Sequence, residues 1–264
     1  MKLTADYHTH TTFSHGKGTI LDNAKHAKEV GLEEICISDH GFNHVFFGMK
    51  RKKLAKMREL AREAEKETGV KVYIGMEADI ISLGGAIDAK KQDGLDFIVL
   101  GFHKCVWTKP FQFFRLCVSN ILREKFMGRE NYHKAPINKG WVKRNTNALC
   151  KAIEKNANIV DAISHPNRHF RVDTLKVAKA CEKHGVAFEL NAKSFGLSLD
   201  ELKQIVKKTK VNFIISSDAH MAQKVGSVQN VFDKIKGIVP AHRILNIDGK
   251  KLIRKKENEF HKAG

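Results

Sequence analysis

The chain has 264 residues, of which 42% are hydrophobic and 29% charged, and its net charge is +18. The five cysteines are scattered without a Cys-x-x-Cys pair, and no apolar stretch approaches the roughly 20 residues that span a membrane, so a disulfide scaffold, a zinc knuckle and a transmembrane protein are disfavoured. We expect one compact cytoplasmic domain over residues 1–264, with an anionic substrate or partner.

Strand-like and helix-like runs alternate along the chain. Strand character is found at residues 2–7, 33–38, 70–76, 95–101, 159–164, 186–191 and 211–216. Amphipathic stretches typical of helices lie at 19–32, 53–69, 145–158, 172–185 and 198–210. Alternating strands and helices predict parallel strands joined by right-handed crossovers, so we expect an α/β fold with seven strands.

Polar side chains stand at the end of every predicted strand. They are His8, His10, Asp39, His40, Glu77, His103, His165, Asn191, Asp218 and His220. The carboxyl ends of parallel strands in a barrel all lie on one face, where loops assemble the active site. The sequence therefore predicts one cluster of metal ligands. Histidines away from strand ends, such as His44, are predicted to be ordinary surface residues.

Six motifs resemble the PHP family, the polymerase and histidinol phosphatase superfamily of metal-dependent phosphoesterases. They are HTHTTFSHG (8–16), SDHG (38–41), GMEADI (75–80), GFHK (101–104), SHPN (164–167) and SSDAH (216–220). The sequence is most similar to the stand-alone bacterial phosphatases of that family. The resemblance implies a distorted TIM-like (βα)7 barrel of parallel strands, with an inserted basic helical segment after the fourth strand.

The resemblance also implies three divalent metal ions. The first would be bound by His8, His10, Glu77 and Asp218. The second would be bound by Glu77, His103 and His165, with Glu77 as a bridge, and the third by His15, His40 and His220. Imidazole and carboxylate ligands without thiolate suit zinc, manganese or iron, and the sequence does not choose among them.

Such a cluster predicts hydrolysis of a phosphate ester, with a small phosphorylated metabolite as substrate and histidinol phosphate as one candidate. Neighbouring metal ions lower the pKa of a bridging water, so that hydroxide attacks the phosphorus in line. We assign the catalytic roles to His10, Glu77 and Asp218. The predicted substrate contacts are Lys104, Arg168 and His169. Strand alternation turns Asp39 away from the ions, which predicts a supporting role.

Two other functions stay open at this point. PHP domains also occur as polymerase-associated nucleases, and a net charge of +18 suits a nucleic-acid backbone, although the basic segment has no recognised base-stacking motif. A metal-dependent amidohydrolase also uses a His-x-His pair, but that function leaves His15, His40, Glu77 and His103 unexplained. We favour a phosphomonoester over nucleic acid as the substrate, and the oligomeric state is open.

The segment from Lys104 to Arg144 is too long for an ordinary connection between a strand and a helix. It contains ten basic and two acidic residues. Apolar residues recur at helical spacing at 111, 114, 118, 121, 122 and 126, which predicts an amphipathic helix. We interpret the insertion, residues 104–142, as a lid over the metal ions. A helix packed on the barrel or at a dimer interface, or one lying on a membrane surface, are the alternatives.

Overall fold

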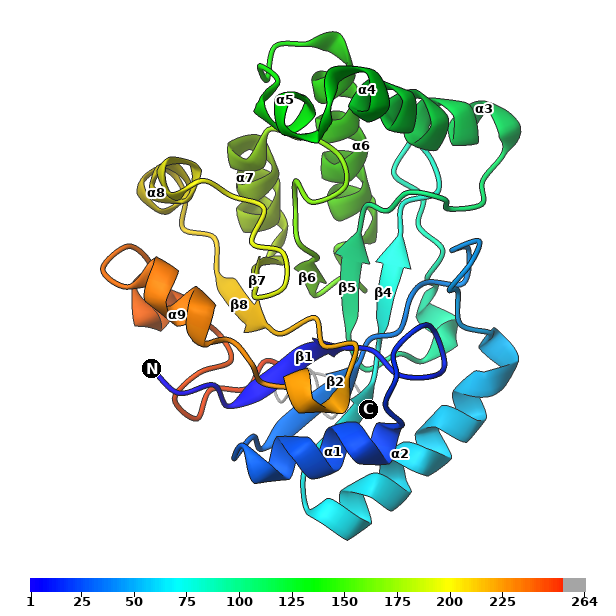
Figure 1. Cartoon of the computed structure of the whole chain (residues 1–264), viewed down its shortest axis with the longest axis vertical. Coiled ribbons are helices and arrows are strands. Elements are labelled where there is room, and N and C mark those ends of the chain that lie inside the picture. Colours follow the sequence, from blue (N-terminus) through cyan, green and yellow to red (C-terminus); the bar gives the residue numbers. More distant parts are fainter. Residues whose placement is uncertain (254–264) are drawn as a thin grey trace.

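The strands form two parallel sheets in the computed structural model, which describes residues 1–253. One sheet contains β1 (Ala5–Thr9), β2 (Glu34–Ile37) and β3 (Lys71–Ile74). The other contains, in spatial order, β4 (Met76–Asp79), β5 (Ile98–Gly101), β6 (Ala162–Ile163), β7 (Ala187–Asn191) and β8 (Phe213–Ser216). Every neighbouring pair is parallel, so the predicted α/β class with parallel strands is confirmed (Figure 1).

The expectation of a single strand over residues 70–76 was wrong. Gly75 separates β3 from β4, and the chain changes partner there, from β2 to β5. A Cβ on Gly75 would lie 2.4 Å from the carbonyl oxygen of Phe97 and 2.6 Å from Cys36 Sγ. Glycine is required because the neighbouring chains approach too closely for a side chain. Within residues 1–253 the strand count is therefore eight in two sheets instead of seven.

The two sheets also meet where β1 lies beside β8. A parallel bridge pairs Thr9 with Ala219. The buried side chain of Asn246 connects the same two strands: its Nδ2 donates to the carbonyl oxygens of Ala5 at 2.7 Å and Ile215 at 2.6 Å, and its Oδ1 accepts from Ile215 N at 3.0 Å. One side chain from the end of the described chain therefore fixes the first strand against the last.

Alternate strand residues are buried on opposite faces. Ile98 and Leu100 of β5 join the larger core cluster, which the helices cover, whereas Val99 joins a smaller inner cluster with Tyr7 and Phe97. Burial on both faces is typical of parallel strands covered by helices. Polar side chains that point to the inner face therefore lie among strands from both sheets.

Five helices occupy the predicted helical stretches. They are α1 (Ile20–Glu29), α2 (Leu54–Thr68), α6 (Gly140–Asn156), α7 (Thr174–His184) and α8 (Leu199–Lys208). Capping boxes begin α1 and α8, where the Thr19 and Ser198 side chains accept from backbone amides. A further helix, α9 (Gln229–Ile235), and four short 3-10 turns, η1 (Arg51–Lys53), η2 (Lys91–Asp93), η4 (Ala222–Lys224) and η5 (Ala241–Arg243), were not predicted.

The segment after β5 is largely helical. α3 (Pro110–Phe113), the π-helical η3 (Phe114–Val118) and α4 (Ser119–Met127) run on without a break, and α5 (Arg129–Lys134) follows after Gly128 (Figure 1). The predicted apolar face is not the buried one, because Leu116, Cys117 and Asn120 are buried while Phe111 and Phe126 are exposed. The π-helical turn shifts the side chains out of α-helical register. Within residues 1–253 no helix is long and apolar enough to cross a membrane.

Candidate metal centre

The predicted ligands gather at the carboxyl ends of the strands of both sheets. His8 lies in β1 and Glu77 in β4, and His10, His40, His103, His165, Asp218 and His220 stand in the segments that follow strands. His220 is half-buried, and the others in this set are buried. The ninth predicted ligand, His15, is also half-buried. Side chains that are far apart in the sequence thus share one site.

Glu77 lies at the middle of the cluster. Its Oε1 lies 2.9 Å from His165 Nε2 and 3.1 Å from His103 Nε2. Its Oε2 lies 3.0 Å from His40 Nδ1 and 3.4 Å from His8 Nε2. His10 Nε2 lies 3.6 Å from the same Oε2. One carboxylate therefore faces five imidazoles that come from both sheets, which is the position that the resemblance implies for a bridging ligand.

Asp218 occupies the other side of the cluster. Its Oδ1 lies 3.3 Å from both His10 Nε2 and His220 Nδ1. Its φ of 54° lies in the left-handed region, which is uncommon for a residue with a side chain and is frequent at functional sites. The Nε2 atoms of His8 and His10 lie 3.1 Å apart. Two ring nitrogens and a carboxylate oxygen therefore converge on a small volume.

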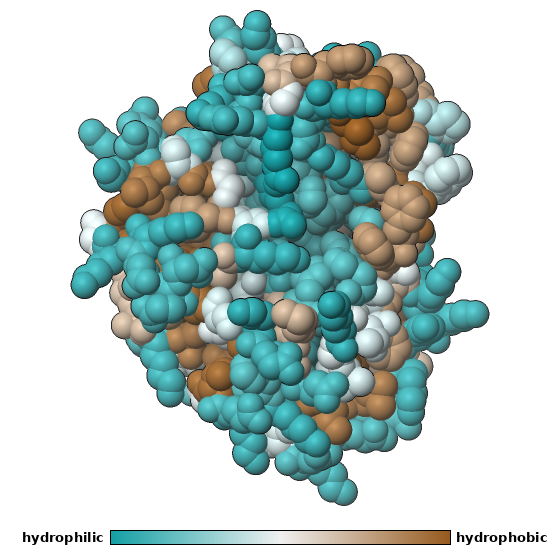
Figure 2. All heavy atoms as spheres, in the orientation of Figure 1, coloured by the Kyte–Doolittle hydropathy of each residue, from teal (hydrophilic) through white to brown (hydrophobic). Residues whose placement is uncertain are grey.

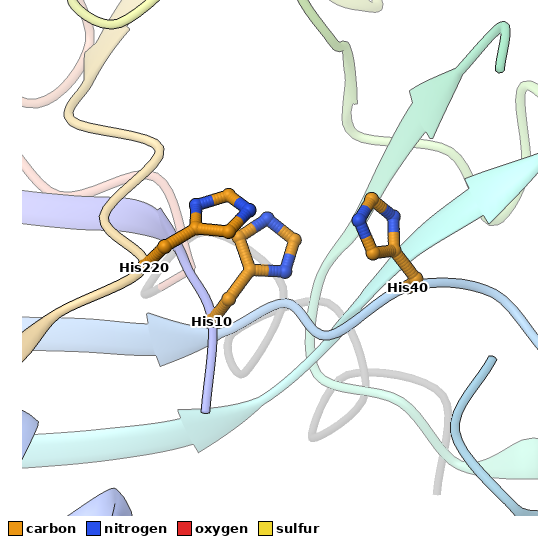
Figure 3. A group of neighbouring side chains, drawn as sticks. All are labelled: His10, His40 and His220. Atoms are coloured by element: carbon orange, nitrogen blue, oxygen red, sulfur yellow. The ribbon is translucent and has the colours of Figure 1, made fainter. Parts of the chain in front are cut away.

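His10, His40 and His220 present their rings toward one another from three different segments (Figure 3). One nitrogen from each lies within 4.8 Å of the others. The His15 ring lies 4.2 Å from that of His220 and 4.7 Å from that of His40, between centroids. The structure therefore places His15 beside His40 and His220. The three histidines whose nitrogens lie within 4.8 Å of one another are, however, His10, His40 and His220.

Two buried carboxylates that the sequence analysis missed contact the ligands from behind. Glu189 Oε1 lies 2.7 Å from His8 Nδ1, and Asp79 Oδ1 lies 2.6 Å from His103 Nδ1. Histidines that bind metal commonly pair their second ring nitrogen with a carboxylate, which fixes the tautomer and the ring orientation. These contacts direct the Nε2 atoms of His8 and His103 toward Glu77.

Strand alternation could have identified both carboxylates. Asp79 lies two positions after Glu77, and Glu189 two positions before Asn191, so each points to the same side as a polar residue at a strand end. Asp39 contacts the loop that follows His10, and its supporting role stays a prediction. It accepts hydrogen bonds from Thr11 N at 2.8 Å and Thr11 Oγ1 at 2.6 Å, and so shapes the loop that leads to His15.

Opposite charges dominate one part of the cluster. Burial disfavours the carboxylate form of Glu77, but His103, His8 and His165 outweigh burial and hold the pKa of Glu77 well below its ordinary value. Burial likewise opposes the charged form of His8, whose pKa is nevertheless raised well above normal by Glu77, Glu189 and Asp218. Glu77 and His8 therefore stabilise each other's charged form against the cost of burial.

Neutral imidazoles form the other part. Burial lowers the pKa of His10 well below its ordinary value. Burial and the neighbouring His40 and His220 lower the pKa of His15 to about 3, and burial lowers that of His220 to about 4. At neutral pH these rings keep a free lone pair, which is the form that binds a metal ion.

Several buried atoms of the cluster form no hydrogen bond within residues 1–253. They are His10 Nδ1, His15 Nδ1, His40 Nδ1, His103 Nε2 and Glu77 Oε2. His40 Nδ1, His103 Nε2 and Glu77 Oε2 lie in the ion pairs described above. A buried polar atom without a hydrogen bond costs free energy, and each of these atoms is able to bind a cation. Imidazole and carboxylate donors without thiolate suit divalent transition ions. The residues present therefore fit a cluster of metal ions.

The three predicted substrate contacts lie in different surroundings. His169 stands beside the centre, and one of its nitrogens groups with those of His103 and His165 within 4.8 Å. Arg168 Nε lies 3.2 Å from His169 Nε2. Lys104, in contrast, forms an ion pair with Glu124 of α4. Its charge is therefore neutralised by the helical segment.

Two further residues near the centre were missed. Lys193 Nζ lies 2.9 Å from His220 Nδ1 and 3.7 Å from Asp218 Oδ1, and its side chain is partly exposed. The prediction that His44 is an ordinary surface residue was wrong, because its ring stacks on that of His40 with centroids 4.8 Å apart. Neither residue ends a strand, so the rule that identified the other site residues could not identify these two.

Comparisons with known proteins match most of the chain. The PHP domain family matches residues 6–193. A protein named probable phosphatase from Vibrio parahaemolyticus is 30% identical over 277 residues, covering 98% of this chain and 92% of that protein. Another from Acetivibrio thermocellus is 28% identical and covers 97% of this chain and 98% of its own.

A solved structure shares the fold. The histidinol phosphate phosphatase from Lactococcus lactis, complexed with zinc, L-histidinol and phosphate, is 14% identical with a TM-score of 0.58, covering 90% of this chain and 93% of that one. The match to the PHP domain includes the motifs that carry His8, His40, Glu77, His103 and His165. The chain therefore belongs to the PHP domain family.

Proposed function

We propose that this protein is a metal-dependent phosphomonoesterase that hydrolyses a small phosphorylated metabolite. The observation that carries the proposal is the position of Glu77, whose two buried oxygens face five imidazoles from both sheets. Two sequence relatives are named probable phosphatases, and the Lactococcus structure holds L-histidinol and phosphate. Histidinol phosphate is therefore one substrate to test among other small phosphate monoesters.

We propose that the nine residues implied by the family resemblance bind divalent ions: His8, His10, His15, His40, Glu77, His103, His165, Asp218 and His220. The bound ions would activate water for attack on phosphorus and neutralise the phosphate oxygens. Glu189 and Asp79 would hold His8 and His103 with their Nε2 atoms toward the ions. The number of ions, and zinc, manganese or iron as their identity, stay predictions.

Cationic side chains at the open side of the centre would bind the phosphate group. Lys193 lies beside Asp218 and His220, and its partial exposure allows it to reach a ligand that enters from solvent. Arg168 and His169 would contribute from the segment after β6. Charge-assisted hydrogen bonds of this kind orient phosphate oxygens. We place Lys193 ahead of Lys104 in this role because Lys104 is paired with Glu124.

Several finer features of the family resemblance stay proposals for this chain. If β3 and β4 are counted as one strand bent at Gly75, and β1 is joined to β8, the strands make up the distorted seven-stranded barrel that the resemblance implies. A single PHP domain over residues 1–264, a lid over residues 104–142 and a cytoplasmic location also stay predictions. Nucleic acid is kept as an alternative substrate for the assays below.

The test measures phosphate release from p-nitrophenyl phosphate by the metal-loaded protein. We expect His10→Ala and Asp218→Ala to lower the rate by at least about 100-fold, because each removes a ligand. His26→Ala is the matched control, since His26 lies on α1 and contacts only Glu29 among the ion pairs within residues 1–253. Degradation of single-stranded DNA with little monoester turnover would contradict the proposal, and fewer than two ions per chain would contradict the three-ion assignment.

A further inference from the structure

A row of large apolar side chains is exposed on the helical segment 110–127. Phe111, Phe114, Leu122 and Phe126, which we call the apolar stripe, are 42–83% exposed. Figure 2 shows hydrophobic atoms gathered at the upper right, over α3 and α4. The same segment buries Leu116, Cys117 and Asn120 on its other side. The segment already has a packed face, so the apolar stripe is a second face, and large exposed apolar patches mark interaction sites.

Two exposed aromatic side chains lie in loops near the start of the same helical segment. Trp107 is 68% exposed, and its ring centroid lies 6.4 Å from that of Phe113. Trp107 N donates to the carbonyl oxygen of Asn43 at 2.7 Å, and Asn43 Nδ2 donates to the carbonyl oxygen of Trp107 at 2.8 Å. This contact places Phe46, which is 71% exposed, in an adjacent loop. Trp and Phe are the side chains that membrane interfaces favour.

Arg115 lies beside the apolar stripe, whereas Arg123 and Arg144 meet at Ser119, a buried residue of the same helical segment. Arg123 Nη1 donates to the carbonyl oxygen of Ser119 at 2.7 Å, and Arg144 Nη2 donates to Ser119 Oγ at 3.0 Å. The Arg115 guanidinium lies 5.7 Å from the centre of the Phe111 ring. None of the three arginines forms an ion pair within residues 1–253, and Arg144 Nε is buried without a hydrogen-bond partner. Guanidinium groups gathered without a carboxylate are suited to phosphate groups.

The net charge of the whole segment also favours a partner with phosphate groups. Residues 104–144 contain ten basic and two acidic residues, an excess of eight. Both acidic side chains are already paired, Glu124 with Lys104 and Glu130 with Lys134. The partner of this surface must therefore be anionic as well as apolar. A bilayer with anionic headgroups combines both properties.

A single nucleic-acid strand would satisfy the charge but not the apolar side chains. Leu122 and the neighbouring Val118 are aliphatic and cannot stack on bases, and the apolar stripe lies on the outward side of a helix instead of in a groove that follows a strand. An amphipathic helix with aromatic residues on one face and Arg or Lys beside them is typical of segments that lie in the membrane interface.

We propose that residues 110–127 lie flat on a lipid bilayer that carries anionic headgroups. The apolar stripe would enter the boundary between headgroups and acyl chains, and Arg115 and Arg123 would bind lipid phosphates. The 18 residues give a helix of about 27 Å, which is ample contact length in the plane of the membrane. The surface is separate from the buried metal ligands, and its occupancy does not depend on turnover.

The test is cosedimentation of the full metal-loaded chain with vesicles of phosphatidylcholine alone or of phosphatidylcholine and phosphatidylglycerol in equal parts. We expect binding to the anionic vesicles, weakened by salt. Phe111→Ser, Phe114→Ser and Phe126→Ser together should reduce binding at least about 10-fold. Arg115→Glu with Arg123→Glu should reduce it roughly 30-fold on anionic vesicles alone.

The matched control carries Val30→Ser and Leu199→Ser, two comparably exposed apolar residues outside the segment, and should bind like the native chain. Circular dichroism checks that every variant is folded. The chain has two tryptophans, so Trp141→Phe leaves Trp107 as the fluorescent probe, and its emission should shift to shorter wavelength on anionic vesicles.

Three results would overturn the proposal. The first is equal binding by the triple phenylalanine variant and the control. The second is loss of vesicle binding in the presence of single-stranded DNA together with no Trp107 shift on vesicles, which would assign the surface to nucleic acid. The third is a native dimer that the triple variant converts to a monomer while no vesicle binds, which would assign the surface to a second copy of the chain.

Discussion

Glu189 is a residue that can tune the metal centre without contacting an ion. It is fully buried, and its two oxygens contact His8 Nδ1 at 2.7 Å and the backbone amide of His165 at 2.5 Å. We expect Glu189→Gln to weaken metal affinity about 10–100-fold, because an amide no longer fixes the charge and tautomer of His8. Isothermal titration of the metal-free protein with zinc measures the change.

Glu34→Gln is the matched control for Glu189→Gln. Glu34 is also a buried glutamate, and its Oε2 accepts a hydrogen bond from the Tyr7 hydroxyl at 2.8 Å, at the start of β2 and away from the cluster. This substitution should alter stability and leave zinc affinity unchanged. Equal losses of zinc affinity in both variants would mean that Glu189 acts only by stabilising the fold.

At the scale of residues, sequence reasoning identified side chains that end strands. It selected His8, Glu77 and His103 because a strand end is visible in the hydrophobic pattern. It missed Glu189, which lies inside a strand, and Lys193, which lies in a loop. The alternation of side chains along a strand could have identified Glu189, whereas the position of Lys193 depends on how a loop returns to the centre, which the local sequence does not show.

Gly75 is the element-scale feature with the clearest energetic consequence. We expect Gly75→Ala to lower the free energy of unfolding by about 1–3 kcal/mol, because the added methyl would overlap the Phe97 carbonyl and Cys36 Sγ. Chemical denaturation measures the change. Gly140→Ala is the control, since nothing lies within 4 Å of a Cβ there, and it should cost nothing or stabilise the chain by less than about 1 kcal/mol. Similar destabilisation by both substitutions would contradict this account of the strand break.

Five helices could be predicted because their apolar faces and caps are local features of the chain. The outward face of residues 110–127 could not be predicted, because the period of an α-helix was applied across Phe114–Val118, where the structure has a π-helical turn. The boundary between β3 and β4 was missed for a related reason. A glycine inside an apolar run does not reveal that the chain changes partner there.

At the scale of the whole molecule, bound ions would connect both sheets. His8 and His40 come from the first sheet, and Glu77 and Asp218 from the second. Because ions that bind only the folded chain stabilise it by mass action, we expect EDTA to lower the melting temperature by roughly 5–10 °C. Thermal unfolding followed by circular dichroism measures the shift.

Addition of zinc after removal of EDTA should restore the melting temperature. Magnesium is the control, and it should restore little, because it prefers oxygen ligands and most ligands of this centre are imidazoles. A melting temperature that is insensitive to EDTA in protein shown to contain metal would contradict a role for the ions in connecting the two sheets.

The hydrogen bonds from Asn246 to β1 and β8 also have a consequence for folding during synthesis on the ribosome. β1 leaves the ribosome first, whereas Asn246, which hydrogen-bonds Ala5 and Ile215, follows more than 200 residues later. His8 and His10 on one side and Asp218 on the other gain this additional connection only when that residue is available. A chain that ends before Asn246 therefore lacks one connection between the strands that lead to His8 and to Asp218, and we expect its metal centre to be less stable.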